Sequence, residues 1–152
     1  MADLNKAIDM QQKRLNLCPE GHPEYSVALH NLALSLSLWY DKQHNLADLD
    51  EAMSLRERNL TQCSVDHPGH AHALCDLAES FTDHDEVTKT LSDLTKAIRL
   101  FKEALAIYPV QYNNYVSTVQ SLARAILLCN SSKGNYPSEH PFPPAEASGL
   151  PP

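Results

Sequence analysis

Apolar residues along most of this chain recur three and four residues apart, the spacing that keeps them on one face of an α-helix. Six segments carry the pattern, and they predict helices over residues 3–17, 24–41, 47–62, 69–83, 92–108 and 111–130. Strict alternation of apolar and polar residues, which indicates β-strands, is absent from the sequence. The pattern therefore predicts an all-α chain up to about residue 130.

Residues that favour helix ends agree with several of these limits. Pro23 suits the first position of a helix, because the backbone donor that proline lacks would be unpaired there in any case. Asp48 and Glu51 have the spacing of a capping box, whose side chains accept hydrogen bonds from unpaired backbone N–H groups. Pro109 should end the segment 92–108, because proline disfavours helical geometry in the preceding residue.

The helical pattern repeats every 45 residues without insertion or deletion. One block of the repeat starts at Leu4, Leu49 and Leu94, and a second block starts at Leu29, Leu74 and Val119. A fixed period of this kind is the signature of arrays in which each unit buries its apolar face only by stacking on the next. The sequence therefore predicts a stack of helix pairs.

The last copy carries the most distinctive motif, Ala97-x3-Phe101-x2-Ala104-x4-Pro109. The two alanines and the phenylalanine share one helical face, on which the small residues admit a neighbouring helix and the ring fills the gap. This spacing resembles the second helix of a tetratricopeptide repeat. The segment Leu77-Ala78-x2-Phe81 approximates the motif of that family's first helix.

The resemblance covers residues 1–130 and implies the fold of that family. This fold is a right-handed superhelical stack of antiparallel helix pairs, a TPR-like α-solenoid, here with about six helices. The family's usual period is about 34 residues. The period of 45 residues, together with Gly21-His22-Pro23 and Asn31-Leu32-Ala33, instead resembles the long arrays of fungal multidomain proteins. Those arrays often adjoin CHAT-type peptidase or nucleotide-binding domains. Kinesin light chain is a more distant relative.

Residues 131–152 differ in composition from the rest of the chain. They hold six of the ten prolines and almost no helical periodicity. Proline-rich segments of this kind remain extended and build no core of their own. We therefore expect a TPR-like helical repeat domain over residues 1–130 and a proline-rich disordered tail over residues 131–152.

Charge and composition argue against several classes of function. The net charge of −7 and the lack of a Lys and Arg cluster disfavour a nucleic-acid partner. No apolar run reaches membrane-spanning length and the N-terminus has no signal-peptide core, so we expect no membrane partner and a cytoplasmic protein. Four cysteines without a secretory signal then indicate reduced thiols. The four glycines form no phosphate-binding loop, and we expect no cofactor.

One segment has the residue types of a zinc site, in the order Cys63-x3-His67-x2-His70-x-His72-x2-Cys75. Its spacing is not that of a known zinc motif. Cys63 and His67 also align with Cys18 and His22 in the 45-residue frame, so their repeat positions explain them more simply. We therefore expect no metal site. No cysteine lies in a nucleophile turn either, so we expect no catalytic residues and no enzyme.

In the tetratricopeptide family, the first helix of each pair lines a concave groove. Spacing from Leu32, Leu77 and Leu122 selects the candidate groove residues, which are Val27, His30, Leu34, Ser37, His72, Cys75, Glu79, Thr82, Ser117, Gln120, Arg124 and Leu127. The same positions also fit plain solvated residues or contacts between repeats. The rows lack the paired Lys and Arg that would clamp a C-terminal carboxylate, which disfavours a receptor for chaperone tails.

These features predict a non-catalytic protein–protein interaction scaffold whose protein or peptide partner docks in the groove. The alternative is a regulatory or sensor fragment of a larger signalling protein, of the CHAT-peptidase or nucleotide-binding type, whose catalytic domain is absent. Both end helices are half-repeats, so we expect them to expose apolar rows and to favour self-association or fraying. These rows are Leu4, Ile8, Met10 and Leu15 at one end, and Leu122, Ile126 and Leu128 at the other.

Overall fold

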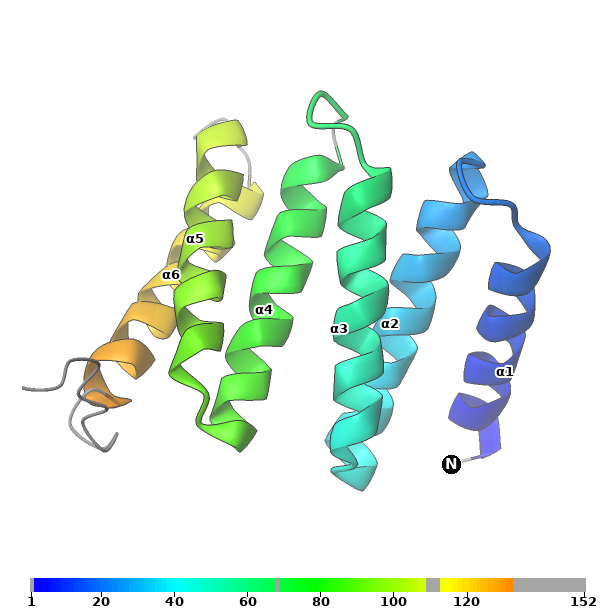
Figure 1. The fold of residues 1–152 in the computed structure, drawn as a ribbon, viewed down its shortest axis with the longest axis horizontal. Coiled ribbons are helices and arrows are strands. Elements are labelled where there is room, and N and C mark those ends of the chain that lie inside the picture. The colour runs from blue at the N-terminus through cyan, green and yellow to red at the C-terminus, as the bar shows by residue number, and fades with distance from the viewer. Residues whose placement is uncertain (1, 68, 109–112, 133–152) are drawn as a thin grey trace, which may run out of the picture.

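The computed structural model of the protein describes residues 2–67, 69–108 and 113–132. These residues form six helices and no strand, namely α1 (Ala2–Leu17), α2 (Pro23–Gln43), α3 (Leu46–Gln62), α4 (His70–Thr88), α5 (Leu91–Ile107) and α6 (Asn113–Ser132). Figure 1 shows the helices standing side by side in one row. The expected all-α solenoid is confirmed. The expectations for Pro109 and for the tail beyond Ser132 lie outside the described residues.

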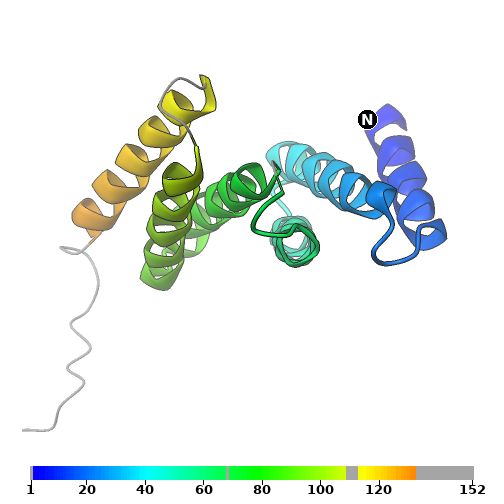
Figure 2. The same cartoon turned by 90° about the horizontal axis from the view of Figure 1, so that it is seen from above.

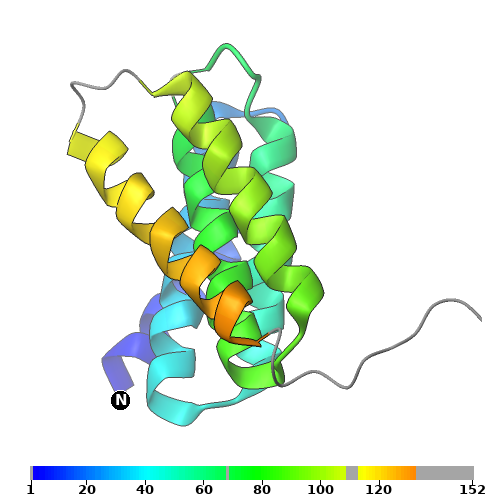
Figure 3. The ribbon, with the colours of Figure 1, turned by 90° about the vertical axis from the view of Figure 1, so that its left-hand side faces the viewer.

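Each helix packs mainly against the helices that precede and follow it in the chain. Seen from above, α3 and α5 lie on one side of the row, and α2 and α6 lie on the other (Figure 2). The helix α4 also touches α6, and Figure 3 shows α5 and α6 side by side with α4 behind them. Within the described ranges, no helix has the length and hydropathy that crossing a bilayer requires.

The start of α2 follows the sequence prediction. Pro23 occupies the first turn, and His22 is the N-cap, with its Nδ1 atom accepting a hydrogen bond of 3.1 Å from the Glu24 N–H. At the other end His44 adopts a left-handed conformation with φ of 54°, and its N–H bonds the Tyr40 carbonyl. This left-handed residue turns the chain back within three residues, so that α2 and α3 form an antiparallel pair.

The capping box predicted at Asp48 and Glu51 is wrong. The helix α3 begins at Leu46, and Asn45 is its N-cap, because the Asn45 Oδ1 atom accepts a hydrogen bond of 3.3 Å from the Ala47 N–H. Asp48 and Glu51 therefore lie inside the helix. Asparagine competes well for the cap position, since its short side chain reaches the free N–H groups of the first turn.

The helix α4 is longer than the predicted segment 69–83 and ends at Thr88. We expected the helix to end near residue 83, but tertiary contacts hold the following residues in the helix. Asp85 is buried, and His84 bonds Asp93 of α5 at 2.7 Å. Lys89 ends the helix in a left-handed conformation, with its N–H bonded to the Asp85 carbonyl at 2.8 Å.

The helices bury two hydrophobic cores along the row. We call the core of α1, α2 and α3 the first core; it contains Leu15, Tyr25, Ala28, Leu29, Leu32, Ala33, Leu36, Ala52 and Leu55. The second core belongs to α4, α5 and α6; it contains Ala71, Leu74, Leu77, Ala78, Phe81, Leu94, Ala97, Leu100, Phe101, Ala104 and Ala125. Both sets consist mostly of the repeated Leu and Ala positions, so the 45-residue period fixes the buried faces.

The end helices expose less apolar surface than expected. Leu15, predicted on an exposed row, is buried in the first core, so that part of the prediction is wrong. Ile8 packs against the same core, and Leu122 and Leu128 pack against the second. Of the residues in the two predicted rows, Met10 and Ile126 are exposed, at 70% and 37% of their surface. The end helices also expose Leu17 on α1 and Val116, Val119 and Leu127 on α6. Self-association through the ends stays a prediction.

The second core depends on Phe101, which is 1% exposed between the fully buried Ala97 and Ala104. Replacing Phe101 by alanine should lower the free energy of unfolding by about 3–5 kcal/mol, because it removes a large ring from a packed core. Gln11 holds the same repeat position on α1 and is only half-buried, so Gln11→Ala is the matched control. Urea denaturation followed by circular dichroism measures both changes. Equal, small losses for the two variants would contradict the role of Phe101.

Candidate functional site

Two adjoining pockets lie along α2, α4 and α6, the helices that carry the predicted groove residues. The first has a volume of about 230 Å³ and is lined by Ser26, Val27, His30, Asn59, Cys63, His67, Gly69, His72, Ala73 and Asp76. The second has a volume of about 170 Å³ and is lined by His72, Cys75, Asp76, Glu79, Tyr108, Asn114, Ser117 and Thr118. His72 and Asp76 line both pockets, so these two residues of α4 form the wall between them.

The structure brings half of the predicted groove residues together. Those that line the two pockets are Val27, His30, His72, Cys75, Glu79 and Ser117. Leu34, Gln120 and Leu127 are exposed on α2 and α6, and Ser37 is half-buried. Thr82 is buried at 2% exposure, with its hydroxyl donating to the Ala78 carbonyl at 3.0 Å. Its side chain therefore belongs to helix packing.

Arg124, another predicted groove residue, links α6 to the last turns of α4. Its guanidinium lies 3.5 Å from the Asp83 carboxylate and donates a shorter hydrogen bond to Glu86. The hydrogen bond to Glu86 raises the pKa of Arg124. The pairing leaves Arg124 engaged with carboxylates of its own chain.

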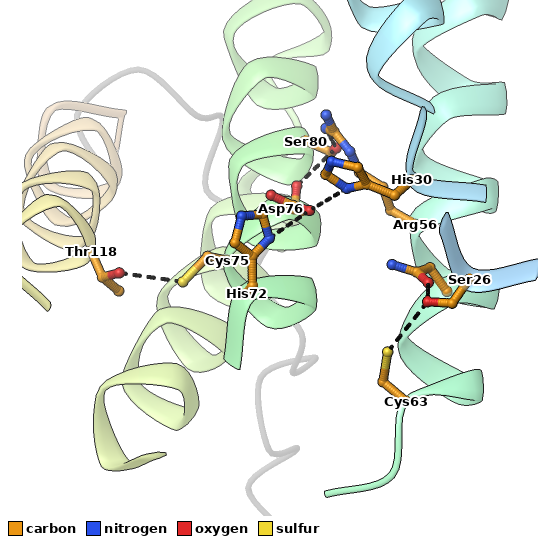
Figure 4. Close-up of polar contacts among 10 residues, drawn as sticks. Ser26, His30, Arg56, Cys63, His72, Cys75, Asp76, Ser80 and Thr118 are labelled. Atoms are coloured by element: carbon orange, nitrogen blue, oxygen red, sulfur yellow. Dashed lines mark hydrogen bonds and ion pairs between the residues drawn. The ribbon is translucent and has the colours of Figure 1, made fainter. Parts of the chain in front are cut away.

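The centre of the site is a cluster of two histidines and one carboxylate. The Nδ1 atoms of His30 and His72 lie 3.0 and 3.1 Å from the same oxygen, Oδ2 of Asp76. Figure 4 shows both rings turned towards this carboxylate, His30 from α2 and His72 from α4. The two rings meet edge to face, with centroids 5.6 Å apart. His72 and Asp76 are four residues apart on α4, which keeps them on one helical face.

The hydrogen bonds set the charges of this cluster. Burial tends to raise the pKa of Asp76, but the hydrogen bonds from His30 and His72 outweigh it and lower that pKa to about 2. The hydrogen bond to Asp76 raises the pKa of His72 above its ordinary value of 6.5. Asp76 is therefore an anion at every physiological pH, and its charge favours the protonated form of His72.

Asp76 is the residue that the sequence analysis missed. The spacing from Leu77 selected His72, Cys75, Glu79 and Thr82 as groove candidates on this helix, and it did not select Asp76. The one local signal is its distance of four residues from His72, which permits a contact on a helix. Its contact with His30 joins residues 46 positions apart, and no local pattern indicates such a pair.

The cysteine and histidine run from Cys63 to Cys75 does not converge. Figure 4 shows Cys63 beside Ser26 and Cys75 beside Thr118, with sulfur-to-oxygen distances of 3.7 and 3.3 Å. His70 points its Nδ1 atom at the Cys63 carbonyl, at 3.0 Å. Burial raises the pKa of the Cys75 thiol, so this thiol is a poor source of the thiolate that a nucleophile or a zinc site needs.

Carboxylates dominate the α4 wall of the second pocket. Burial raises the pKa of Glu79, and the neighbouring charges of Asp76 and Asp83 raise it further. The Glu79 carboxylate accepts a hydrogen bond of 3.4 Å from the neutral hydroxyl of Ser121 on α6. The pocket thus presents negative charge that a cation would stabilise.

The fold is similar to that of a solved tetratricopeptide-like array. A crystal structure of nearly identical TPR-like repeats, from a protein titled a kinesin light chain of Podosopora anserina, matches with a TM-score of 0.62. The match covers 92% of this chain and 72% of that one, at 17% sequence identity. No protein-family model matches the chain. No curated protein matches it either. The likeness at this identity is one of fold, and it agrees with the TPR-like helical repeat.

The His72 and Asp76 pair predicts a pH-dependent contribution to stability. Because the folded-state pKa of His72 is raised, its contribution is complete below the unfolded value of about 6.5 and is lost as pH rises through the folded value. Between about pH 8 and pH 6 the wild type should therefore gain stability relative to His72→Gln, by less than about 1 kcal/mol because solvent screens this half-exposed pair.

Urea denaturation of both proteins at each pH measures this difference. Charged groups away from this cluster are common to the two proteins, so their contributions cancel in the comparison. A difference in unfolding free energy that stays constant, or that shrinks as the pH falls, would contradict the role of Asp76 in raising the pKa of His72.

Proposed function

We propose that this chain is a non-catalytic interaction module that binds a peptide of a partner protein along α2, α4 and α6. The observation that carries the proposal is the pair of pockets that share His72 and Asp76 and extend from α2 to α6. These two pockets have volumes of about 230 and 170 Å³, and a third pocket of about 390 Å³ adjoins the first through Ser26, Val27, Cys63 and His67. Their size suits individual side chains of a peptide.

The chemistry of the walls favours a peptide that carries Lys or Arg. Arg124 already pairs with Asp83 and Glu86. Glu79 accepts a hydrogen bond from Ser121, and the charge of Arg56 offsets part of the rise in its pKa that burial, Asp76 and Asp83 cause. A cationic side chain in the second pocket would approach Glu79 and Asp76 and offset their mutual repulsion. In the first pocket, the half-exposed Val27 offers an apolar contact for another side chain of the same peptide.

The cysteines support a binding function over a catalytic one. Cys63 and Cys75 contact hydroxyl groups of different helices, Ser26 on α2 and Thr118 on α6. Covalent catalysis needs a nucleophile within hydrogen-bond reach of a base. Cys75 has a neutral threonine in that position and a raised pKa, which opposes its activation. A role as a regulatory part of a larger signalling protein stays a prediction, since its test is the coding sequence around this chain.

Selection from a library of random displayed peptides tests the proposal, with the folded chain as bait. Enriched peptides should carry Lys or Arg beside an apolar residue, and a synthetic copy should bind more weakly as salt screens the charges. Glu79→Gln should weaken this peptide about fivefold, the equivalent of about 1 kcal/mol for one partly exposed ion pair.

The matched control is Glu103→Gln, which changes an exposed glutamate on α5. This variant should bind the selected peptide as tightly as the wild type does. A library without any enriched sequence would contradict peptide binding, and equal affinities for the Glu79 and Glu103 variants would contradict the placement of the cationic side chain.

A further inference from the structure

We propose that His30, His72 and Asp76 bind a divalent transition-metal ion of the zinc type at the junction between the two hydrophobic cores. The observations behind it are separate from those for peptide binding, but the two sites share His72 and Asp76, so a bound ion would occupy part of the proposed peptide site. The proposed ligand set shares only His72 with the run between Cys63 and Cys75, where we expected no metal, and it adds His30 and Asp76 from outside that run. Among the described residues, it is the group of metal-ligating side chains that the fold brings together.

The geometry of the three side chains is close to that of a zinc site. Each residue offers one ligand atom, and all three atoms lie within 4.8 Å of one another. The two nitrogen-to-oxygen distances are 3.0 and 3.1 Å. Zinc bonds of about 2.0–2.1 Å in a tetrahedral arrangement separate neighbouring ligand atoms by about 3.3 Å. Small rotations of the imidazole rings would therefore seat an ion where the shared hydrogen bonds now lie.

The choice of ligands indicates the class of metal. Imidazole nitrogens together with one carboxylate suit zinc, cobalt or nickel, whereas calcium and magnesium prefer sets of oxygen ligands. Binding would move the protons of the two Nδ1 atoms, either to the Nε2 atoms of neutral rings or to solvent from a protonated His72. Three protein ligands leave a fourth position for water, as in open zinc sites.

The site is accessible and partly preformed. The side chain of His72 is 54% exposed and that of His30 is 37% exposed, and both line the 230 Å³ pocket, so an ion has a path from solvent. The Asp76 side chain is only 17% exposed and remains ionised. Ser80 donates to the Asp76 carbonyl and accepts a hydrogen bond from Arg56 of α3, as Figure 4 shows, which ties this turn of α4 to α3.

An ion bound at this position would connect the two halves of the structure. His30 belongs to α2 on the side of the first core, whereas His72 and Asp76 belong to α4 on the side of the second. The described contacts between the two halves lie mainly between α3 and α4. An ion bound by all three residues would join α2 directly to α4 and stiffen the stack across this junction.

Isothermal titration of the reduced full chain with zinc chloride tests the site. One equivalent should bind with micromolar affinity or better, and the melting temperature should rise with zinc concentration. His72→Gln should weaken binding at least about tenfold, since even the loss of a group that only orients a ligand costs about 10–100-fold. His72 is half-exposed, so this variant should keep the helical spectrum of the wild type.

Two controls separate this site from other metal ligands of the chain. His44→Gln removes a histidine outside the cluster, and Cys75→Ser removes the nearest thiol of the second pocket; both should leave zinc affinity unchanged. Cobalt bound in place of zinc should show no thiolate-to-metal charge-transfer absorption. Loss of affinity in Cys75→Ser, or a thiolate band in the cobalt protein, would overturn the proposed ligand set.

His30→Gln tests the link between the two halves. It should weaken zinc binding as much as His72→Gln does and remove the zinc-induced rise in melting temperature. Unchanged affinity in His30→Gln would overturn a site that spans α2 and α4, because the ion would then rest on α4 alone. Absence of stoichiometric zinc binding to the wild type would overturn the proposal altogether.

Discussion

The packing of α3 against α4 is the constraint on which the rest of the structure depends, because it is where the helices of the first core meet those of the second. Met53 and Leu60 of α3 supply the apolar part of this junction by packing against the second core. A helical repeat buries its apolar face only against its neighbours, so the stability of each half depends on this contact. This contact also sets the direction of the whole row, because α2 is packed on α3 in one half and α5 is packed on α4 in the other.

Much of the junction is polar, and its polar groups are paired. Arg56 of α3 donates to the buried Ser80 of α4, and His84 of α4 lies between Asp50 of α3 and Asp93 of α5. Asp93 is buried at 4% exposure, and a buried carboxylate without partners would be strongly unfavourable. These pairs explain why α4 continues to Thr88: its last turns are held by contacts with both neighbouring helices.

The candidate site lies at the same junction, on the side formed by α2 and α4. His72 and Asp76 form the wall between the two pockets and also contact His30 across the junction. Any ligand that contacts these side chains therefore acts on the interface that orders the two halves. Coupling between ligand binding and the packing of the two halves would need no chain of intermediate residues, because the binding residues are themselves part of the junction.

The sequence by itself determined the six helices, their repeat and most of the buried residues, because period and residue size are local properties that suffice to fix one face of each helix. It identified Phe101 as a core residue for the same reason, whereas His30 and His72 were candidate groove residues only through the resemblance to the tetratricopeptide family. Only the tertiary structure decided which polar residues meet. Asp48 has the local features of a helix cap, but the upstream Asn45 caps that helix instead, and Asp93 is bound by His84 of another helix. The contact of Asp76 with His30 depends on how one repeat is seated against the next, and that seating results from the packing of whole helices, which the spacing within one helix does not encode.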